Sequence, residues 1–196
     1  MADIARNHRA PTTEAEIEAY TVGGTRRLDG PVSLAEYDPA WPNLFTREAA
    51  RIKRLLGGTA KRIEHVGSTS VPGLAAKPII DIVMEVRDSS DEDAYVAPLE
   101  SHGYELRIRE PNWYEHRVLK GPDTDVNLHV FTVGCVEVTR MLRFRDHLRT
   151  SASDRKLYED TKRELAKRNW AYIQNYADAK TGVIEAILAG GGIVPG

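Results

Sequence analysis

The stretch HVGSTSVPGLAAKPIIDIVMEV, residues 65–86, decides the fold of this chain. A Gly-Ser pair at 67–68 follows a short apolar segment, and one carboxylate, Asp81, lies inside an otherwise apolar run. We interpret residues 62–66 and 78–86 as two strands, the second nearly all apolar, as a central strand covered on both faces would be. A carboxylate in such a strand is costly unless it has a partner, so Asp81 needs an explanation.

A turn of this kind before a strand with an aspartate is typical of a phosphate site. Gly67 lets the backbone approach an anion closely, and the residues after it offer hydroxyl and N–H groups. Lys77 would supply a positive charge to a phosphate, and Asp81 would supply a hard oxygen ligand for Mg²⁺. The predicted phosphate-binding residues are Gly67, Ser68, Thr69, Ser70 and, on a later helical segment, Arg145.

Each of these residues also has an ordinary structural interpretation. The Gly-Ser pair would make a tight turn and a helix cap, and Asp81 would pair with an arginine. Lys77 precedes a proline and would be a solvated loop lysine. Arg145 would belong to a salt-bridged helix start that docks the C-terminal part. We interpret Lys162, with the basic residues around it, as part of a solvated helix face.

Three familiar phosphate motifs do not match this stretch. It has neither the Gly-Lys-Ser/Thr of a P-loop nor three glycines at dinucleotide-binding spacing, and no serine here has the glycines of a nucleophile elbow. What remains is the polymerase-β-type nucleotidyltransferase pattern, Gly-Ser and then Asp-x-Asp or Asp-x-Glu on a strand. Val83 occupies the second carboxylate position, and Glu85 lies about 13 Å from Asp81 along the strand. This spacing argues against a paired-carboxylate, two-metal site.

Other chemistry-bearing residues extend the candidate site. His129 alternates with apolar residues in a predicted strand over 126–133 and shares a face with Asn127. The predicted catalytic residues are Asp81, which is also the predicted metal ligand, His129 and Lys77. Further candidates are His65, Glu85, Asn127, Tyr176 and Lys180, the last two related by i, i+4 helical spacing. His129 would otherwise be only hydrogen-bonded, and His65 would only orient the Gly-Ser loop.

The rest of the chain predicts an α+β domain, a mixed sheet with flanking helices and a helical C-terminal part. We divide it into an N-terminal extension at 1–30, a single domain at 31–190 and a tail at 191–196. Thr13 and Glu16 have capping-box spacing for a short helix in the extension. The other predicted elements are a strand at 32–37, a helix opened by Asp38 and Pro39 and ending near 57, a helix at 91–101, strands at 104–109, 113–119 and 126–133, and helices from 138 onward.

Composition restricts the class of protein. The chain has 196 residues and a net charge of -2, which gives no global attraction to nucleic acid, so we do not expect a nucleic-acid partner. No apolar run is long enough to span a membrane, and the N-terminus has no apolar core of a signal peptide, so we expect a cytoplasmic protein with no membrane partner. The single cysteine, Cys135, excludes an intramolecular disulfide.

Three stretches resemble the GrpB family: residues 65–82, residues 37–42 together with Phe45, and residues 144–149 followed by Tyr158. The similarity runs from residue 32 to about 190. The resemblance implies a nucleotidyltransferase-like fold. The family that the chain resembles also occurs fused to dephospho-CoA kinase. It implies no assigned activity.

Three hypotheses follow. In the first, the protein binds a nucleotide or similar phosphorylated small molecule with Mg²⁺ at Asp81 and transfers a nucleotidyl group. The second is a non-catalytic ligand-binding or partner module linked to coenzyme A metabolism, motivated by Val83 and by the fusion. The third is phosphoester hydrolysis by a metal ion and histidine, using His65, His129 and Asp81. The residues leave the substrate, the acceptor and the oligomeric state open.

Overall fold

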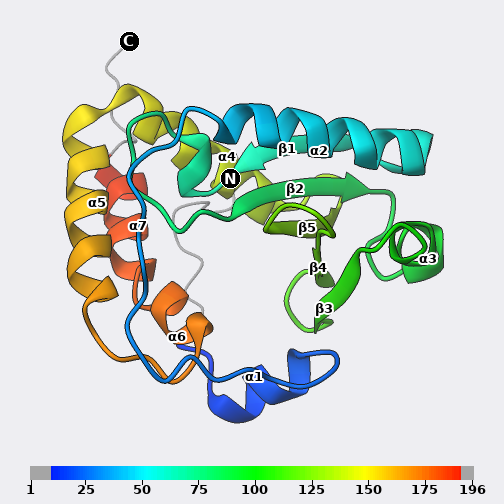
Figure 1. The fold of residues 1–196 in the computed structure, drawn as a ribbon, viewed down its shortest axis with the longest axis horizontal. Coiled ribbons are helices and arrows are strands. Elements are labelled where there is room, and N and C mark those ends of the chain that lie inside the picture. The colour runs from blue at the N-terminus through cyan, green and yellow to red at the C-terminus, as the bar shows by residue number, and fades with distance from the viewer. Residues whose placement is uncertain (1–9, 191–196) are drawn as a thin grey trace.

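The computed structural model describes residues 10–190, so the predicted tail and the first nine residues of the predicted extension lie outside the described part. The described part is a five-stranded sheet with helices around it (Figure 1). The strands are β1 (Arg62–Val66), β2 (Ile80–Val86), β3 (Glu105–Glu110), β4 (His116–Lys120) and β5 (Val126–Thr132). The helices are α1 (Glu14–Tyr20), α2 (Trp41–Leu56), α3 (Val96–Glu100), α4 (Val136–Thr150), α5 (Ala152–Ala166), α6 (Ile173–Asp178) and α7 (Thr181–Gly190).

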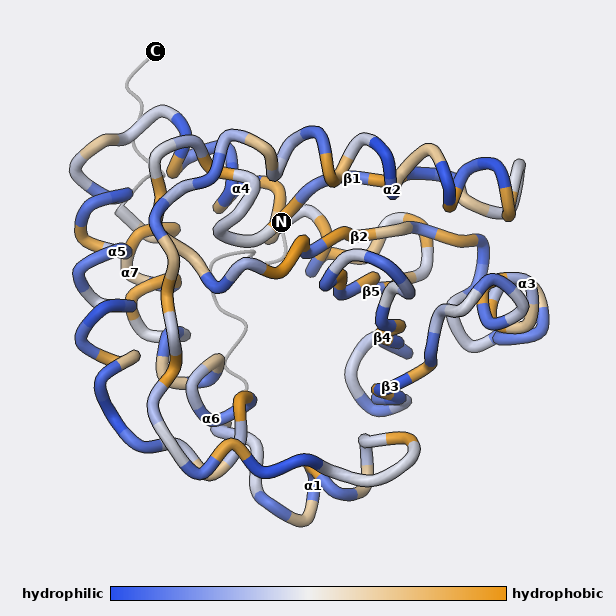
Figure 2. The backbone as a smooth tube through the Cα atoms, viewed as in Figure 1, coloured by the Kyte–Doolittle hydropathy of each residue, from blue (hydrophilic) through white to orange (hydrophobic). Residues whose placement is uncertain are grey.

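The sheet has the order β1-β2-β5-β4-β3. Its two central strands, β2 and β5, run parallel, and every other neighbouring pair is antiparallel. The apolar character of β2 runs along its length in Figure 2, as a strand covered on both faces requires. The predicted mixed α+β fold is therefore confirmed.

Successive side chains of β2 enter two different cores. Ile82 and Met84 are fully buried against α2, where Ile52 is fully buried as well. On the other face Val83 packs with Phe131 of β5 and with α4. Full burial of a side chain of this size is worth roughly 1.5–3 kcal/mol, so the two faces together hold β2 in place. Asp81 lies at the start of β2, on the Val83 face, where the strand end faces α5 and α7 (Figure 1).

The helices after β5 form a second layer beside the sheet. The Gly-Ser turn and its continuation pack on this layer through Val71 and Leu74, which contact Leu148, Tyr158 and Ile187. This packing places the turn between β1, β2 and the C-terminal helices.

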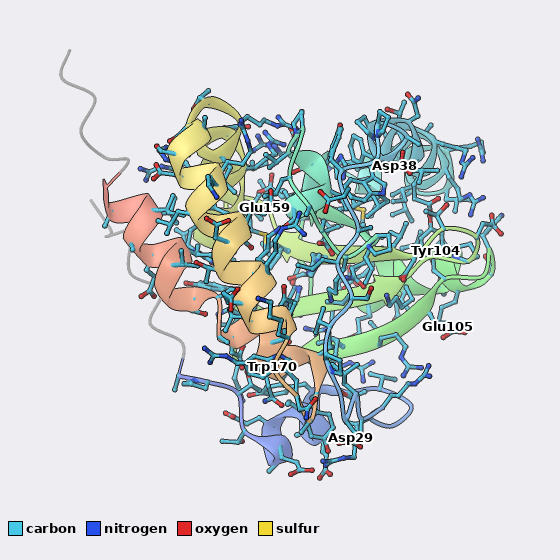
Figure 3. The ribbon with its side chains drawn as sticks, turned by 60° about the vertical axis from the view of Figure 1, so that its left-hand side comes forward. Asp29, Asp38, Tyr104, Glu105, Glu159 and Trp170 are labelled. Atoms are coloured by element: carbon cyan, nitrogen blue, oxygen red, sulfur yellow. The ribbon has the colours of Figure 1, made fainter. Side chains whose placement is uncertain are left out.

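The N-terminal segment closes one side of the molecule. Its backbone binds the edge of the sheet through Val22 N–H and Arg107 O at 2.9 Å, and it binds the helical layer through Leu28 N–H and Ala171 O at 2.8 Å. Figure 3 shows this segment, with Asp29 labelled, running below the turn after α5 that carries Trp170. The predicted capping box is present, because Thr13 and Glu16 exchange side-chain and backbone hydrogen bonds.

Several predicted boundaries are wrong for identifiable reasons. Residues 32–37 form no strand; only Ala35 pairs, with Ala76, because the partner segment is interrupted by prolines that lack an N–H. The helix expected at 91–101 is a 3₁₀ turn (Glu92–Ala94) followed by α3, since the Pro98 ring would clash with the carbonyl four residues earlier.

Two element starts are also shifted. The helix predicted to open at Asp38 and Pro39 begins at Trp41, and the Asp38 carboxylate accepts from Ala40 N–H in the turn before it. The strand predicted from residue 113 begins at His116, because Tyr114 and its neighbour have positive φ and turn the chain first.

Candidate functional site

A cavity of about 340 Å³ lies between the Gly-Ser turn, the start of β2, β5 and the C-terminal helices. On its helix side Phe144, Leu148 and Ile184 offer an apolar surface, next to the polar side chains of Arg140, Arg145 and Gln174. Eight of the predicted residues line it: Gly67, Ser68, Lys77, Asp81, Asn127, His129, Arg145 and Lys180. Residues from five parts of the chain therefore meet in one space, although their proposed roles stay predictions.

The turn and the aspartate are brought together by the pairing of β1 with β2. Val66 lies opposite Asp81 in this antiparallel ladder, so the residue after Val66 passes directly over the carboxylate. Gly67 has φ of 69°, and a Cβ at this position would lie 3.0 Å from the Asp81 Cβ and nearer still to its carboxylate. A side chain at position 67 would therefore displace Asp81.

Asp81 has two polar neighbours on β5. Its Oδ1 accepts a hydrogen bond from Asn127 Nδ2 at 2.8 Å and lies 3.7 Å from His129 Nε2. Burial alone would raise the pKa of Asp81, but its contacts with His129 and Asn127 outweigh burial and hold the pKa below its ordinary value. The carboxylate is thus ionised at neutral pH and partly open to the cavity.

His129 is the outer member of a chain of polar groups that runs into the protein. His129 Nδ1 lies 3.0 Å from His116 Nε2, and His116 Nδ1 lies 2.7 Å from Glu110 Oε2. His116 and Glu110 are both buried. The edge strands β3 and β4 therefore orient an imidazole that β5 presents to the cavity.

The distances along this chain rank its contacts. The His129–Asp81 contact is the longest, at 3.7 Å, and exceeds hydrogen-bond length, whereas the two inner contacts are 2.7 Å and 3.0 Å long. The inner contacts therefore fix the orientation of both rings, and His129 Nε2 faces the cavity beside Asp81.

The buried contacts predict that this chain of groups stabilises the fold. His116→Phe keeps the ring that packs on Phe131 and removes both polar contacts, and it is expected to cost about 1–3 kcal/mol because buried Glu110 loses a hydrogen-bond partner. Urea unfolding measures this cost, and His102→Phe is the exposed control. Equal effects of the two substitutions would contradict the prediction.

Two lysines that line the cavity, Lys77 and Lys180, give it a positive character. Lys77 lies in the loop before β2, and Lys180 lies between α6 and α7 with its Nζ 4.7 Å from the Tyr176 ring centroid. Burial, with a smaller contribution from the positive charge of Lys180, lowers the pKa of Lys77 to about 8. Burial also lowers the pKa of Lys180, against the negative charge of Asp81. Within residues 10–190 neither ammonium is held in an ion pair.

Three predicted residues hold the loop and do not line the main cavity. Thr69 Oγ1 donates to Ile79 O and contacts His65 Nε2, both at 3.1 Å. Ser70 Oγ donates to Gly67 O at 2.6 Å. Burial lowers the pKa of His65 to about 4, so its imidazole is neutral and stacks on Phe45. These contacts fix the path of the Gly-Ser turn.

Three more predicted residues have other partners. Arg145 lines the cavity, but its guanidinium donates to Glu64, to His65 O and to Asp146. Glu85 does not reach the cavity: it is buried two strand steps away and accepts from Gly134 N–H at 2.9 Å. Tyr176 is buried and lines a smaller hollow of about 50 Å³ behind the Gly-Ser turn, together with Thr69.

The prediction that Lys162 belongs to a solvated helix face is wrong. It is 2% exposed and points from α5 toward the Gly-Ser turn, where its Nζ lies 3.1 Å from Ser68 Oγ. The buried face of α5 contains Tyr158, Lys162 and Leu165, which is a helical stripe that a purely apolar pattern does not reveal. His116 and Glu110 were also missed, because only the register of β3, β4 and β5 brings them to His129.

Comparison with known proteins finds relatives that match most of the chain. The family model described as GrpB protein matches residues 31–190. A UPF0157 protein of Halalkalibacterium halodurans is 56% identical over 93% of each chain, and one of Streptomyces coelicolor is 43% identical over 98% of each chain. The crystal structure of conserved protein GrpB from Enterococcus faecalis superposes with a TM-score of 0.70 at 33% identity, covering 81% of this chain and 98% of that one.

Similarity also extends to larger proteins. A protein named dephospho-CoA kinase from Mycobacterium leprae is 28% identical to this chain, which it covers to 83%, while the match spans 47% of that protein. Within residues 10–190 we find no helix with the length and apolar character needed to cross a bilayer.

Proposed function

Because this chain belongs to the GrpB family, we propose that it binds a phosphorylated small molecule, a nucleotide in the first instance, in the cavity beside Asp81. The observation that carries this proposal is the pair of lysines, Lys77 and Lys180, which face the cavity and have no ion-pair partner within residues 10–190. A partly buried ammonium without a partner is unfavourable, and an anionic ligand would supply the missing charge.

The shape of the cavity supports a ligand with a phosphate part and an apolar or aromatic part. Phosphates fit the sheet side, between the two lysines and the Gly-Ser turn, where Gly67 allows close approach of the backbone. Phe144, Leu148 and Ile184 on the helix side offer a surface for a base or another flat group. The volume of about 340 Å³ is in the range of small-molecule sites.

The donor set is compatible with one Mg²⁺ and not with a pair of ions. Within the described residues no three or more His, Cys, Asp or Glu side chains are grouped to hold a metal ion. The second carboxylate position is Val83, which is 1% exposed in the core. Mg²⁺ commonly takes one or two carboxylates together with substrate phosphates, so Asp81 would hold a single ion that arrives with the ligand. Such an ion would neutralise phosphate charge.

If the protein is catalytic, transfer of a nucleotidyl group is the reaction we propose. The residues of the chain would bind and orient the reactants: Lys77 and Lys180 hold the phosphates, and the lone pair of His129 Nε2 accepts a proton from an acceptor hydroxyl. The contact with His116 Nε2 at 3.0 Å holds the His129 ring with this nitrogen directed at the cavity.

A second candidate is a binding module without turnover. The burial of Val83 favours it. In the nucleotidyltransferase pattern this strand position carries a second metal-binding carboxylate, whereas here it holds a valine packed in the hydrophobic core. The relative named dephospho-CoA kinase suggests coenzyme A metabolism as the setting for such a module. Turnover of a nucleoside triphosphate that requires Asp81 would exclude this candidate.

The proposal predicts ligand-dependent thermal stabilisation. Melting with each nucleoside triphosphate, dephospho-CoA or pyrophosphate, with and without Mg²⁺, is expected to raise Tm by roughly 5–10 °C at about 100 times Kd, which corresponds to about 2.7 kcal/mol. Lys77→Met and Lys180→Met are each expected to abolish most of this shift, because the phosphates lose their charge partners. Asp81→Asn is expected to remove only the part that needs Mg²⁺.

Lys156→Met is the matched control, because Lys156 is 75% exposed and does not line the cavity. It is expected to keep the full shift. The proposal would be wrong if none of these anions stabilised the wild type, or if both cavity lysines could be replaced without reducing the shift.

A further inference from the structure

The buried lysine Lys162 has no role in the ligand site proposed above. It does not line the main cavity, and it approaches the Gly-Ser turn from behind. Its Nζ donates to Ala75 O, lies 3.1 Å from Ser68 Oγ and sits 4.9 Å from the Tyr158 ring centroid. Within residues 10–190 no carboxylate forms an ion pair with it. Its polar contacts are therefore one carbonyl and one hydroxyl.

Burial at this position favours the uncharged amine. Burial, with a smaller contribution from the positive charge of Lys180, lowers the pKa of Lys162 to about 7. Glu159 acts in the opposite direction, and Arg163, to which it is bound, lowers the pKa of Lys162. A neutral amine at this place can donate to Ala75 O and still direct its lone pair at Ser68.

Ser68 lies between this amine and the cavity. Its side chain is half-buried, and it lines both the main cavity and the hollow that contains Lys162. Burial raises the pKa of Tyr158 to about 12, so its hydroxyl stays protonated, and it hydrogen-bonds with Ser68. A serine hydroxyl can rotate between its neighbours, so the Ser68 proton can also be directed at Lys162 Nζ, 3.1 Å away.

The arrangement has the parts of an activated nucleophile. A hydroxyl and a base lie within hydrogen-bond distance, and a third group, the Ala75 carbonyl, orients the base. A serine paired with a lysine is a known variant of such a constellation. A lysine that only bound phosphate would face the ligand, as Lys77 and Lys180 do.

We propose that Ser68 is a nucleophile, activated by Lys162, that attacks a phosphorus atom of a phosphoanhydride in the cavity. This inference rests on the proposed function for the identity of its electrophile. The Ser68 Oγ–P bond forms and the serine proton passes to Lys162 Nζ. The anhydride P–O bond breaks, and its electron pair leaves on the departing phosphate or pyrophosphate, between Lys77 and Lys180. The product is a phosphoester of Ser68.

The test uses a fluorophosphonate probe, which needs no nucleotide because fluoride is its leaving group. The full chain is incubated with the probe and the labelled peptide is identified by mass spectrometry. Ser68 is expected to be labelled at least about 100-fold faster than the exposed Ser153, as general-base assistance gives. Ser68→Ala is expected to lose this label, Lys162→Met to slow it by a similar factor, and Lys156→Met to leave it unchanged.

The pH dependence of the wild type gives a second readout that does not depend on a variant folding. The labelling rate is expected to rise with a midpoint near pH 7, set by Lys162 in the field of Lys180, Glu159, Arg163 and Tyr158. Labelling of Ser68 no faster than Ser153, or an equal rate in folded Lys162→Met, would overturn the inference. If a nucleotide stabilises the protein but the probe does not label Ser68, only this inference is wrong. If the probe labels Ser68 but no phosphate compound stabilises the protein, the proposed ligand is wrong.

Discussion

Gly67→Ala is expected to lower the free energy of unfolding by at least about 3 kcal/mol and to abolish ligand stabilisation. The backbone at Gly67, with φ of 69° and ψ of -175°, is a conformation essentially confined to glycine, and it costs about 1–3 kcal/mol for any residue with a Cβ. A further cost comes from the methyl group, which would be 3.0 Å from the Asp81 Cβ and closer to its carboxylate. Either the turn moves away or Asp81 leaves its hydrogen bond with Asn127, and both changes open the site.

Gly73→Ala is a matched control for this variant. Gly73 has φ of 77° and lies in the same loop, and a Cβ added at this position would have no heavy atom within 4 Å. It is expected to cost only the backbone term, about 1 kcal/mol. Urea unfolding of both variants measures the difference. Equal destabilisation of the two would show that the contact between Gly67 and Asp81 is not what requires glycine at position 67.

Lys162→Met is expected to raise the free energy of unfolding at pH 6 by about 2–4 kcal/mol, or roughly 5–10 °C in Tm. At pH 6 the wild-type lysine is protonated in both states, and the folded state has to hold this charge in a buried place. Methionine has a similar length and no charge, and it loses only the contacts with Ser68 and Ala75. Replacing a buried charge by an apolar side chain of similar volume is often stabilising.

The pH dependence gives the sign of this effect. The pKa of Lys162 falls from 10.5 to about 7 on folding, so the unfolded chain binds more protons between these values. Wild-type stability should therefore rise with pH from about 7 toward 9, with Lys77 contributing in the same direction above pH 8. The variant should show a smaller rise, and its advantage should shrink at pH 9.

Lys167→Met is the control for this measurement, because Lys167 is 70% exposed. It is expected to change stability by no more than about 0.5 kcal/mol. The comparison stays below pH 10, where Tyr95 and Tyr104, whose pKa values are raised by burial, begin to destabilise the folded state. A loss of stability in Lys162→Met at pH 6 would mean that the two hydrogen bonds outweigh the cost of the buried charge.

Much of the candidate site could be predicted because its parts are close in sequence. Gly67, Ser68 and Asp81 are joined by one turn and one antiparallel pair of strands, so their spacing nearly determines their contact. The residues predicted from β5 also reach the cavity, because Asn127 pairs directly with Asp81 in the parallel ladder. Glu85 was predicted from the same strand as Asp81 but does not reach the cavity. Residues on one face of a strand are two positions apart, so each step along that face takes the side chain further from the site.

Residues far apart in sequence could not be predicted in this way. Lys162 is 94 residues from Ser68, and in a helix a lysine ordinarily indicates the solvated face. Its burial follows from how α5 is turned against the Gly-Ser loop, which depends on the packing of Tyr158 and Leu165. The chain from His129 to Glu110 likewise depends on three strands and their register.

The amino-acid sequence by itself determined the mixed α+β fold, the tight Gly-Ser turn and the central strand with Asp81, because hydrophobic periodicity and glycine geometry act over a few residues. The tertiary structure alone decided which charges meet. It brought Lys77 and Lys180 to one cavity, buried Lys162 behind Ser68 and aligned His116 with His129. Charge and proton affinity depend on burial and on neighbours from distant segments, and these exist only once the chain has packed.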